Sequence, residues 1–242
     1  LNPDIYFGDS AYYRSSREKL YRQIQHGGGK IVVLDTEGGV FRSREEYEKR
    51  LSPDILQYVD CFLAWGSLPA EIACETPNFS RDMVEITGNP RFDLLQPGLR
   101  DIYKPAAKSY YNRYGNYILI NTNFTATNPF HQDRAELKNN ERVSYQTKLR
   151  NEFNIAIQSL HEELDQYVFI IRPHPSENHN QYRDEFESNN NVVIKHEGDV
   201  RAWIHGASAI IHNSCTTGIE SALMKTPVFS YRPVRNSEFD QE

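Results

Sequence analysis

The sequence has 242 residues, of which 38% are hydrophobic, 12% aromatic and 25% charged, as in a globular protein with one large or two small cores. A formal net charge of -6 argues against a general affinity for nucleic acid, although it leaves room for a local basic site that binds a phosphorylated ligand. No apolar run approaches the ~20 residues of a membrane span, and three scattered cysteines indicate a reducing compartment without a disulfide framework or a metal site.

The first hundred residues alternate between strand and helix patterns. A strand at 4–9 precedes a helix that stops at three glycines, and a buried strand at 30–34 runs into the sequence Asp-Thr-Glu-Gly-Gly. The series continues with a charged helix at 43–51 and a short strand at 60–65. A helix at 69–74, with proline in its first turn, and a last strand at 83–87 complete it.

A stretch rich in proline, glycine and tyrosine, at residues 96–115, interrupts the periodicity. We therefore predict a domain boundary near residue 100, with an N-terminal domain at 1–100 and a C-terminal domain at 101–242. Strands and helices alternate again in the second domain, which predicts parallel sheets with right-handed crossovers. The predicted fold class is α/β, with two Rossmann-like parallel-sheet domains.

The stretch from Tyr167 to Pro175 is the most strongly patterned part of the chain. Its β-branched and aromatic run predicts a strand buried on both faces. Two prolines then hold Arg172 and His174 in a stiff turn at the carboxyl end of the strand, where open α/β sheets bind ligands. The alternative is a rigid exit loop without a ligand.

A loop of small hydroxyl residues follows the predicted strand at 209–212 and leads directly into a helix. The free N–H groups of that helix, together with the hydroxyls of Ser214, Thr216 and Thr217, would suit an anion. The alternative is that these residues only cap the helix. The loop lacks the lysine of a Walker A sequence, so hydrolysis of a nucleoside triphosphate is not indicated.

Two acids follow the buried strand at 30–34. Asp35 and Glu37, with glycines behind them, would suit a general base that faces a substrate hydroxyl, and the alternative is a solvated acidic turn. Asn121, Thr122 and Asn123 end another predicted strand and could either bind ligand or form an ordinary turn.

The order of these motifs resembles bacterial surface-carbohydrate biosynthesis proteins of the GT-B glycosyltransferase type, including transferases that use CMP-activated Kdo or sialic acid. The resemblance covers about residues 30–231 and implies two domains that face a cleft, the first binding the acceptor and the second the nucleotide sugar. It makes Glu37 the base, His174 and Pro175 the nucleotide-binding residues, and Ser214, Thr216 and Thr217 the phosphate-binding residues. Thr36 stands where this family has a second acid, so Asp35 remains a rival base. A complete GT-B protein has further strands and a C-terminal helical segment, so we expect a chain truncated at one or both ends.

We therefore expect a metal-independent glycosyltransferase without a cofactor, which moves a Kdo-like or sialic-acid-like sugar from a CMP-linked donor to a glycan or lipid-linked glycan acceptor. We expect it in the cytoplasm, in peripheral association with the envelope biosynthesis machinery at the inner face of the membrane. The alternatives are a UDP-GlcNAc 2-epimerase-like enzyme, a CDP-glycerol-type transferase and a non-catalytic nucleotide-sugar-binding fragment. Besides the catalytic candidates Glu37, Asp35 and His174, the predicted ligand-binding residues are Asn121, Thr122, Asn123, Arg172, His174, Pro175, Asn213, Ser214, Thr216, Thr217, Gly218 and Glu220.

Overall fold

The computed structural model describes residues 3–39, 41, 43–77, 79–130, 141–236 and 239. The chain divides into two compact units, the first up to Asp93 and the second from Leu94 onward. The sequence placed a boundary near residue 100. The segment between these two positions groups with the second unit, where the Arg100 guanidinium donates to the carbonyl of Met224 at 2.8 Å.

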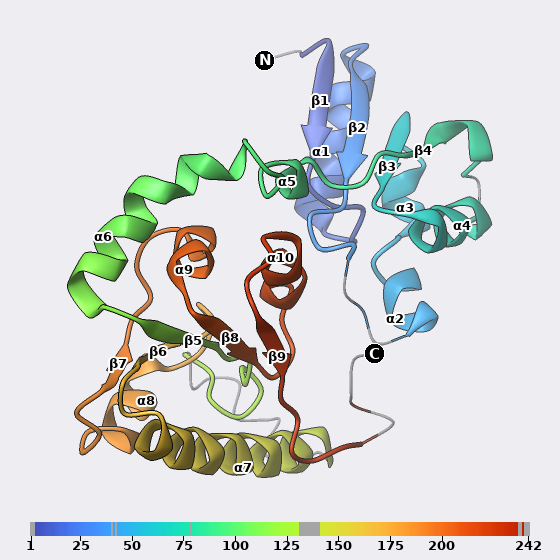
Figure 1. Ribbon diagram of the computed structural model, residues 1–242. Coiled ribbons are helices and arrows are strands. Elements are labelled where there is room, and N and C mark those ends of the chain that lie inside the picture. The colour runs from blue at the N-terminus through green and yellow to red at the C-terminus, as the bar shows by residue number, and fades with distance from the viewer. Residues whose placement is uncertain are drawn as a thin grey trace. The chain divides into compact units, whose positions relative to one another are not determined.

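The first unit contains a parallel sheet with the strand order β1-β2-β3-β4 (Figure 1). A helix or a helical turn precedes each of the strands β2, β3 and β4, as expected for right-handed crossovers. The elements are β1 (Ile5–Gly8), α1 (Ser15–His26), β2 (Lys30–Leu34), α2 (Arg44–Glu48), α3 (Pro53–Leu56), β3 (Cys61–Ala64), α4 (Ser67–Glu75), η1 (Arg81–Met83), β4 (Val84–Ile86) and α5 (Pro90–Asp93).

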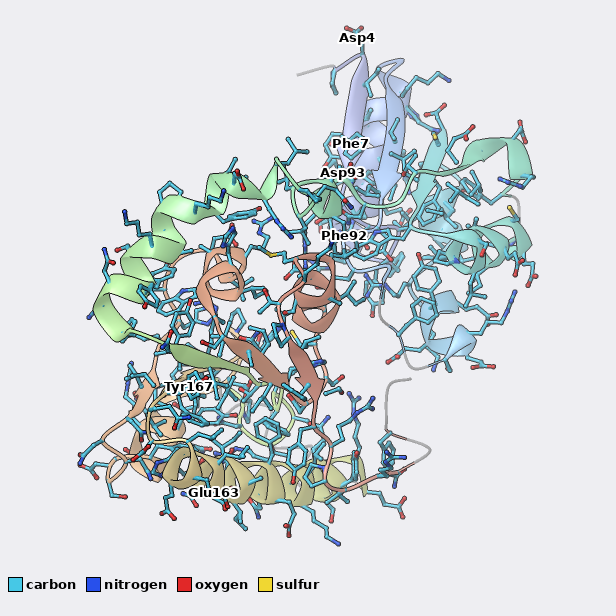
Figure 2. All side chains as sticks on the ribbon, in the orientation of Figure 1. Asp4, Phe7, Phe92, Asp93, Glu163 and Tyr167 are labelled. Atoms are coloured by element: carbon cyan, nitrogen blue, oxygen red, sulfur yellow. The ribbon has the colours of Figure 1, made fainter. Side chains whose placement is uncertain are left out.

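Helices cover one face of this sheet, and on the other face the edge strand β1 is exposed. Ile31, Val33 and Phe62 are fully buried against the helices of the unit. On the opposite face, Ile5 and Phe7 of the edge strand are 65% and 60% exposed (Phe7 is labelled in Figure 2). The hydrophobic core of the first unit therefore lies on one side of its sheet.

The second unit contains a five-stranded parallel sheet with the order β7-β6-β5-β8-β9. The chain starts at the centre, moves outward to β7, and then returns to the other side of β5, so the unit is doubly wound. The elements are η2 (Arg100–Tyr103), α6 (Lys104–Tyr114), β5 (Tyr117–Asn121), α7 (Glu141–Glu163), β6 (Val168–Arg172), α8 (His179–Glu185), β7 (Val192–Ile194), α9 (Val200–Gly206), β8 (Ala209–His212), α10 (Thr217–Leu223) and β9 (Val228–Ser230).

Helices cover both faces of this sheet. The long helix α7 runs along one face, whereas α6, α9 and α10 lie on the other (Figure 1). All five residues of β5 are buried, and Phe153 of α7 packs with Ile120 and Phe169 in one core. The two α/β parallel sheets predicted from the alternating pattern are confirmed. None of the helices in the described ranges combines the length and the apolar character that a membrane crossing requires.

Candidate functional site

The carboxyl ends of three neighbouring strands meet at one edge of the second sheet. Asn121, the last residue of β5, is in register with Arg172 of β6 on one side and with His212 of β8 on the other. The loops that follow these strands carry most of the predicted ligand-binding residues. The structure therefore brings together, at a single sheet edge, segments that lie up to about ninety residues apart in the sequence.

The loop after β5 is tied to the turn after β6 by a buried carboxylate. Glu177, which is 0% exposed, accepts a hydrogen bond at 3.0 Å from the Thr122 hydroxyl and one at 2.9 Å from the backbone N–H of His174. The two loops also exchange backbone hydrogen bonds, because the N–H of Asn178 donates to Asn128 and the N–H of Phe130 donates to Ser176. The Thr122 hydroxyl is thus engaged inside the protein.

The loop after β5 is also tied to the loop after β8. The backbone N–H of Asn123 donates to the Asn213 side chain at 2.9 Å, and the Asn213 amide donates back to the Asn123 carbonyl at 3.2 Å. The Asn123 amide donates in addition to the carbonyl of Ser214 at 3.3 Å. Since three loops are cross-linked in this way, their relative positions are fixed without a ligand.

Arg172 anchors a neighbouring loop. Its two terminal guanidinium nitrogens donate to the carbonyls of Glu197 and Gly198, at 2.8 and 2.9 Å. Arg172 is only 9% exposed, and both of these donors are bonded within the protein. Burial lowers the pKa of its guanidinium, yet an arginine remains charged at any pH of interest.

His174 is half-buried in the turn and Pro175 is exposed. The N–H of Ser176 donates to Nδ1 of His174 at 3.2 Å, so in the neutral ring the proton resides on Nε2. Two further histidines flank the turn: His179 contacts the His174 carbonyl, and Nδ1 of His196 lies 2.8 Å from the Pro173 carbonyl. The turn can therefore present an N–H donor from His174 at the sheet edge.

The loop after β8 is packed closely against the sheet. Thr217 accepts a hydrogen bond from the Asn121 amide at 3.1 Å, and Thr216, at the N-cap of α10, makes no side-chain capping bond. A Cβ on Gly218 would lie 2.5 Å from Nε2 of His212, so only glycine fits against that ring. Burial, and then the charge of Arg232, lower the pKa of His212.

Glu220, also a predicted ligand-binding residue, is buried in α10 at 1% exposure. The pKa of Arg201 is raised, first by its hydrogen bond to Asp199 and to a lesser extent by the charge of Glu220. Glu220 therefore contributes to the electrostatics of the helix layer beside Arg201.

In the first unit, the two acids after β2 have different surroundings. Asp35 is 2% exposed and forms a two-pronged ion pair with Arg50, from Nε to Oδ2 at 3.0 Å and from Nη2 to Oδ1 at 2.6 Å. The Glu37 side chain is 76% exposed, and one of its carboxylate oxygens lies 3.6 Å from the Arg50 guanidinium. Asp35 therefore stabilises the loop, whereas Glu37 is largely exposed.

Trp65, at the end of β3, supports the same loop. Its indole N–H donates to the carbonyl of Asp35, and a Cβ on Gly39 would lie 2.1 Å from its ring. Phe92 also packs edge-on with the indole, with ring centroids 5.1 Å apart. The glycine of the acidic loop is thus required by close contact with an aromatic ring.

Sequence reasoning missed Arg50, Trp65 and Glu177. Each lies outside the motif that it supports or looks like an ordinary polar residue in the sequence. A Glu three residues after His174, across a proline-containing turn, was the one available signal. Within the described residues, no group of three or more His, Cys, Asp or Glu side chains is arranged to hold a metal ion.

The fold defines a protein with two parallel-sheet α/β domains of the GT-B type. Its structure is similar to UDP-GlcNAc 2-epimerase from Methanocaldococcus jannaschii over 93% of this chain and 60% of that one, at 15% identity and a TM-score of 0.57. The UDP-GlcNAc-bound 2-epimerase from Neisseria meningitidis matches over 95% and 59%, at 15% identity and a TM-score of 0.56. The wall teichoic acid polymerase TagF matches over 84% and 49%, at 12% identity and a TM-score of 0.52.

Similarities at 12–15% identity show the fold alone. The chain spans about 60% of the length of the two epimerases. No family model matches the sequence, and no curated protein matches it. The similarity to transferases that use CMP-linked Kdo or sialic acid stays a prediction.

Proposed function

We propose that the chain is a nucleotide-sugar-dependent glycosyltransferase of envelope glycan assembly, with a CMP-linked donor. The observation that carries this proposal is the cross-linked sheet edge of the second unit. There the Asn123 loop is bonded on one side to the His174 turn through Thr122 and Glu177, and on the other to the loop at 213–217. A preformed edge with an imidazole donor and several hydroxyls suits a phosphorylated ligand.

The donor binds through its nucleotide to this edge. Nε2–H of His174 and the hydroxyls of Ser214 and Thr216 donate to its phosphate. As the bond to the sugar breaks, negative charge grows on that phosphate, and donors already in place stabilise it without having to reorganise. Asn213 and Gly218 hold the loop so that these donors keep their positions.

Glu37 takes the proton of the acceptor hydroxyl. Both oxygens of Asp35 are occupied by Arg50, so among the two acids Glu37 is the one available to a substrate. General base catalysis by a positioned carboxylate is worth typically 10² to 10⁴-fold in rate. The acceptor is a glycan or a lipid-linked glycan.

The second candidate is a sugar-nucleotide 2-epimerase, which the similarity to two UDP-GlcNAc 2-epimerases favours. It keeps the nucleotide site in the second unit but needs no acceptor. Incubation with UDP-GlcNAc alone separates the two functions, because only an epimerase yields a changed UDP-linked sugar without an acceptor. The similarity to TagF favours a third function, a CDP-glycerol-type transfer, which requires a CDP-linked donor.

The test is a thermal-shift comparison of CMP, CDP, UMP and UDP with the wild type and His174→Ala. A nucleotide at 100 times its dissociation constant adds about 2.7 kcal/mol of stability. We expect cytidine nucleotides to stabilise the wild type and to lose that effect in His174→Ala. His26→Ala, an exposed histidine at the end of α1, is the matched control and should respond like the wild type.

Three other outcomes would redirect the proposal. Stabilisation by uridine nucleotides alone would favour the epimerase or a UDP-sugar transferase. An undiminished effect in His174→Ala would remove His174 from the site. If no nucleotide acts on the wild type, the proposed function is wrong.

A further inference from the structure

Glu177 is a fully buried carboxylate in the loop that follows the His174 turn. Its Oε1 accepts from the Thr122 hydroxyl at 3.0 Å and from the His174 N–H at 2.9 Å, and its Oε2 accepts from the Tyr182 hydroxyl at 2.6 Å. Burying a carboxylate is costly unless it is well hydrogen-bonded, and three donors converge on this one. Glu177 is therefore held inside the protein by specific partners, one of which is the backbone of His174.

Glu177 holds the backbone of His174 from both sides, through its carboxylate and through its own backbone N–H. The N–H of His174 donates to Oε1, and the backbone N–H of Glu177 donates to the His174 carbonyl at 2.9 Å. The second bond closes a four-residue turn with Pro175 at its second position, where the fixed φ of proline is favourable. Both polar backbone groups of His174 are thus bonded to the same residue.

The fixed backbone determines how the imidazole is presented. Within this turn the N–H of Ser176 points at Nδ1 of His174, at 3.2 Å, and that contact leaves the proton of the neutral ring on Nε2. If the turn opens, the Ser176 contact is lost and both neutral tautomers become accessible. Glu177 therefore influences the tautomer of His174 through the turn and the Ser176 contact.

The surroundings keep Glu177 in its accepting role. Burial first, and then the negative charge of Glu177, raise the pKa of the Tyr182 hydroxyl well above its ordinary value, so this group stays protonated and donates. Thr122 extends the arrangement to the strand end of β5, which couples the turn to the loop that contacts Asn213.

We propose that Glu177 is a positioning residue that holds His174 in the orientation and tautomer that present Nε2–H to the nucleotide phosphate. Being fully buried, Glu177 acts through His174 and not on the ligand itself. The role rests on the proposed function in so far as it names the phosphate, whereas the effect on the His174 ring is independent of it.

The experiment compares Glu177→Gln with the wild type by nitrogen NMR of the histidine rings, the His174 signals being assigned by their loss in His174→Ala. Glutamine keeps the shape but places an amide donor where a carboxylate oxygen accepted. We expect the wild type to show the Nε2–H form and Glu177→Gln to show a mixture of tautomers. Calorimetric titration of the same proteins with CMP, CDP and UDP should give, for the nucleotide that binds the wild type, an affinity at least about tenfold weaker in the variant, as for one hydrogen bond to a charged group.

Two further variants keep the result interpretable. Glu185→Gln is the matched control: Glu185 is a hydrogen-bonded carboxylate of the same unit, with its side chain 34% exposed, but it pairs with Arg150 and Asn154. It should leave the His174 tautomer unchanged even if the protein is less stable. Tyr182→Phe removes one donor from Glu177 and serves if Glu177→Gln fails to fold; it should shift the tautomer in the same direction to a smaller extent.

The outcomes separate this inference from the proposed function. An unchanged Nε2–H signature in folded Glu177→Gln, or an equal change in Glu185→Gln, overturns the positioning role. If none of CMP, CDP and UDP binds the wild type, the proposed function fails, while the tautomer comparison still decides whether Glu177 controls His174.

Discussion

Replacing Arg50 with methionine should destabilise the first unit strongly. Methionine keeps much of the apolar stem but leaves the Asp35 carboxylate, 2% exposed, without the two hydrogen bonds of 3.0 and 2.6 Å that the guanidinium supplies. Removing one partner of a buried ion pair costs about 3–5 kcal/mol, because a charge remains buried without compensation. The Arg50 side chain is itself 27% exposed, so water reaches part of the pair and we expect a loss of about 3 kcal/mol.

The assay is urea unfolding of fluorotryptophan-labelled protein by NMR. The chain has two tryptophans, with Trp65 in the first unit and Trp203 in the second, so each unit has its own signal. The Trp65 transition should move to lower urea while that of Trp203 stays in place. The double variant Asp35→Asn with Arg50→Met should recover much of the loss, because no charge is then stranded.

Arg44→Met provides the comparison for a surface ion pair. Arg44 contacts Glu48 and Glu75, whose side chains are 48% and 65% exposed, and the Trp65 transition should hardly move. A loss below about 1 kcal/mol in Arg50→Met, or no recovery in the double variant, would refute the view that Asp35 serves the structure of the loop.

The remaining predictions concern the two sheet edges. Glu37→Gln should reduce transfer at least about 10²-fold without shifting the unfolding midpoint, as measured by turnover and urea titration. Gly218→Ala should weaken nucleotide binding in calorimetry, because the new Cβ would lie 2.5 Å from the His212 ring and displace the loop. Gly39→Ala should lower the unfolding midpoint of the first unit, since its Cβ would lie 2.1 Å from Trp65. Because the pKa of His212 is lowered in the folded chain, the unfolded chain binds a proton at a pH where the folded chain does not. The free energy of unfolding should therefore fall as pH drops below about 6.5. His212→Gln should reduce this dependence of the unfolding free energy on pH, as measured by urea titrations at several pH values.

The alternating strands and helices were readable from the sequence because buried parallel strands leave a local mark. The run that becomes β6 contains no polar break before Arg172, and the prolines around His174 end it sharply. That the loops of β5 and β8 lie next to each other was not readable, since the sheet order depends on which strands pair across ninety residues. Local patterns carry no information about that choice.

The roles within the two edges were harder to predict than their locations. Asp35 and Glu37 are nearly equivalent in the sequence, and only the presence of Arg50 fifteen residues later separates them. Glu177 lies in a polar run that reads as solvated, yet it is fully buried. A side chain's partners in space, rather than its own chemistry, decide such cases, so single-sequence reasoning finds the loop and not the function of each residue in it.

The return of the chain from β7 to β8 has a consequence for folding. The central strand β5 gains its second neighbour only after β6 and β7 have been added, and the bond between Asn123 and Asn213 closes a loop of ninety residues. Such long-range pairing is slow, because chain entropy is lost before the contacts repay it. During synthesis the His174 turn leaves the ribosome well before the loop at 213–217, and domains fold as units in that direction. The edge of the second sheet is therefore completed late. While β8 is still inside the ribosome, the emerged chain contains the His174 turn but not the loop at 213–217.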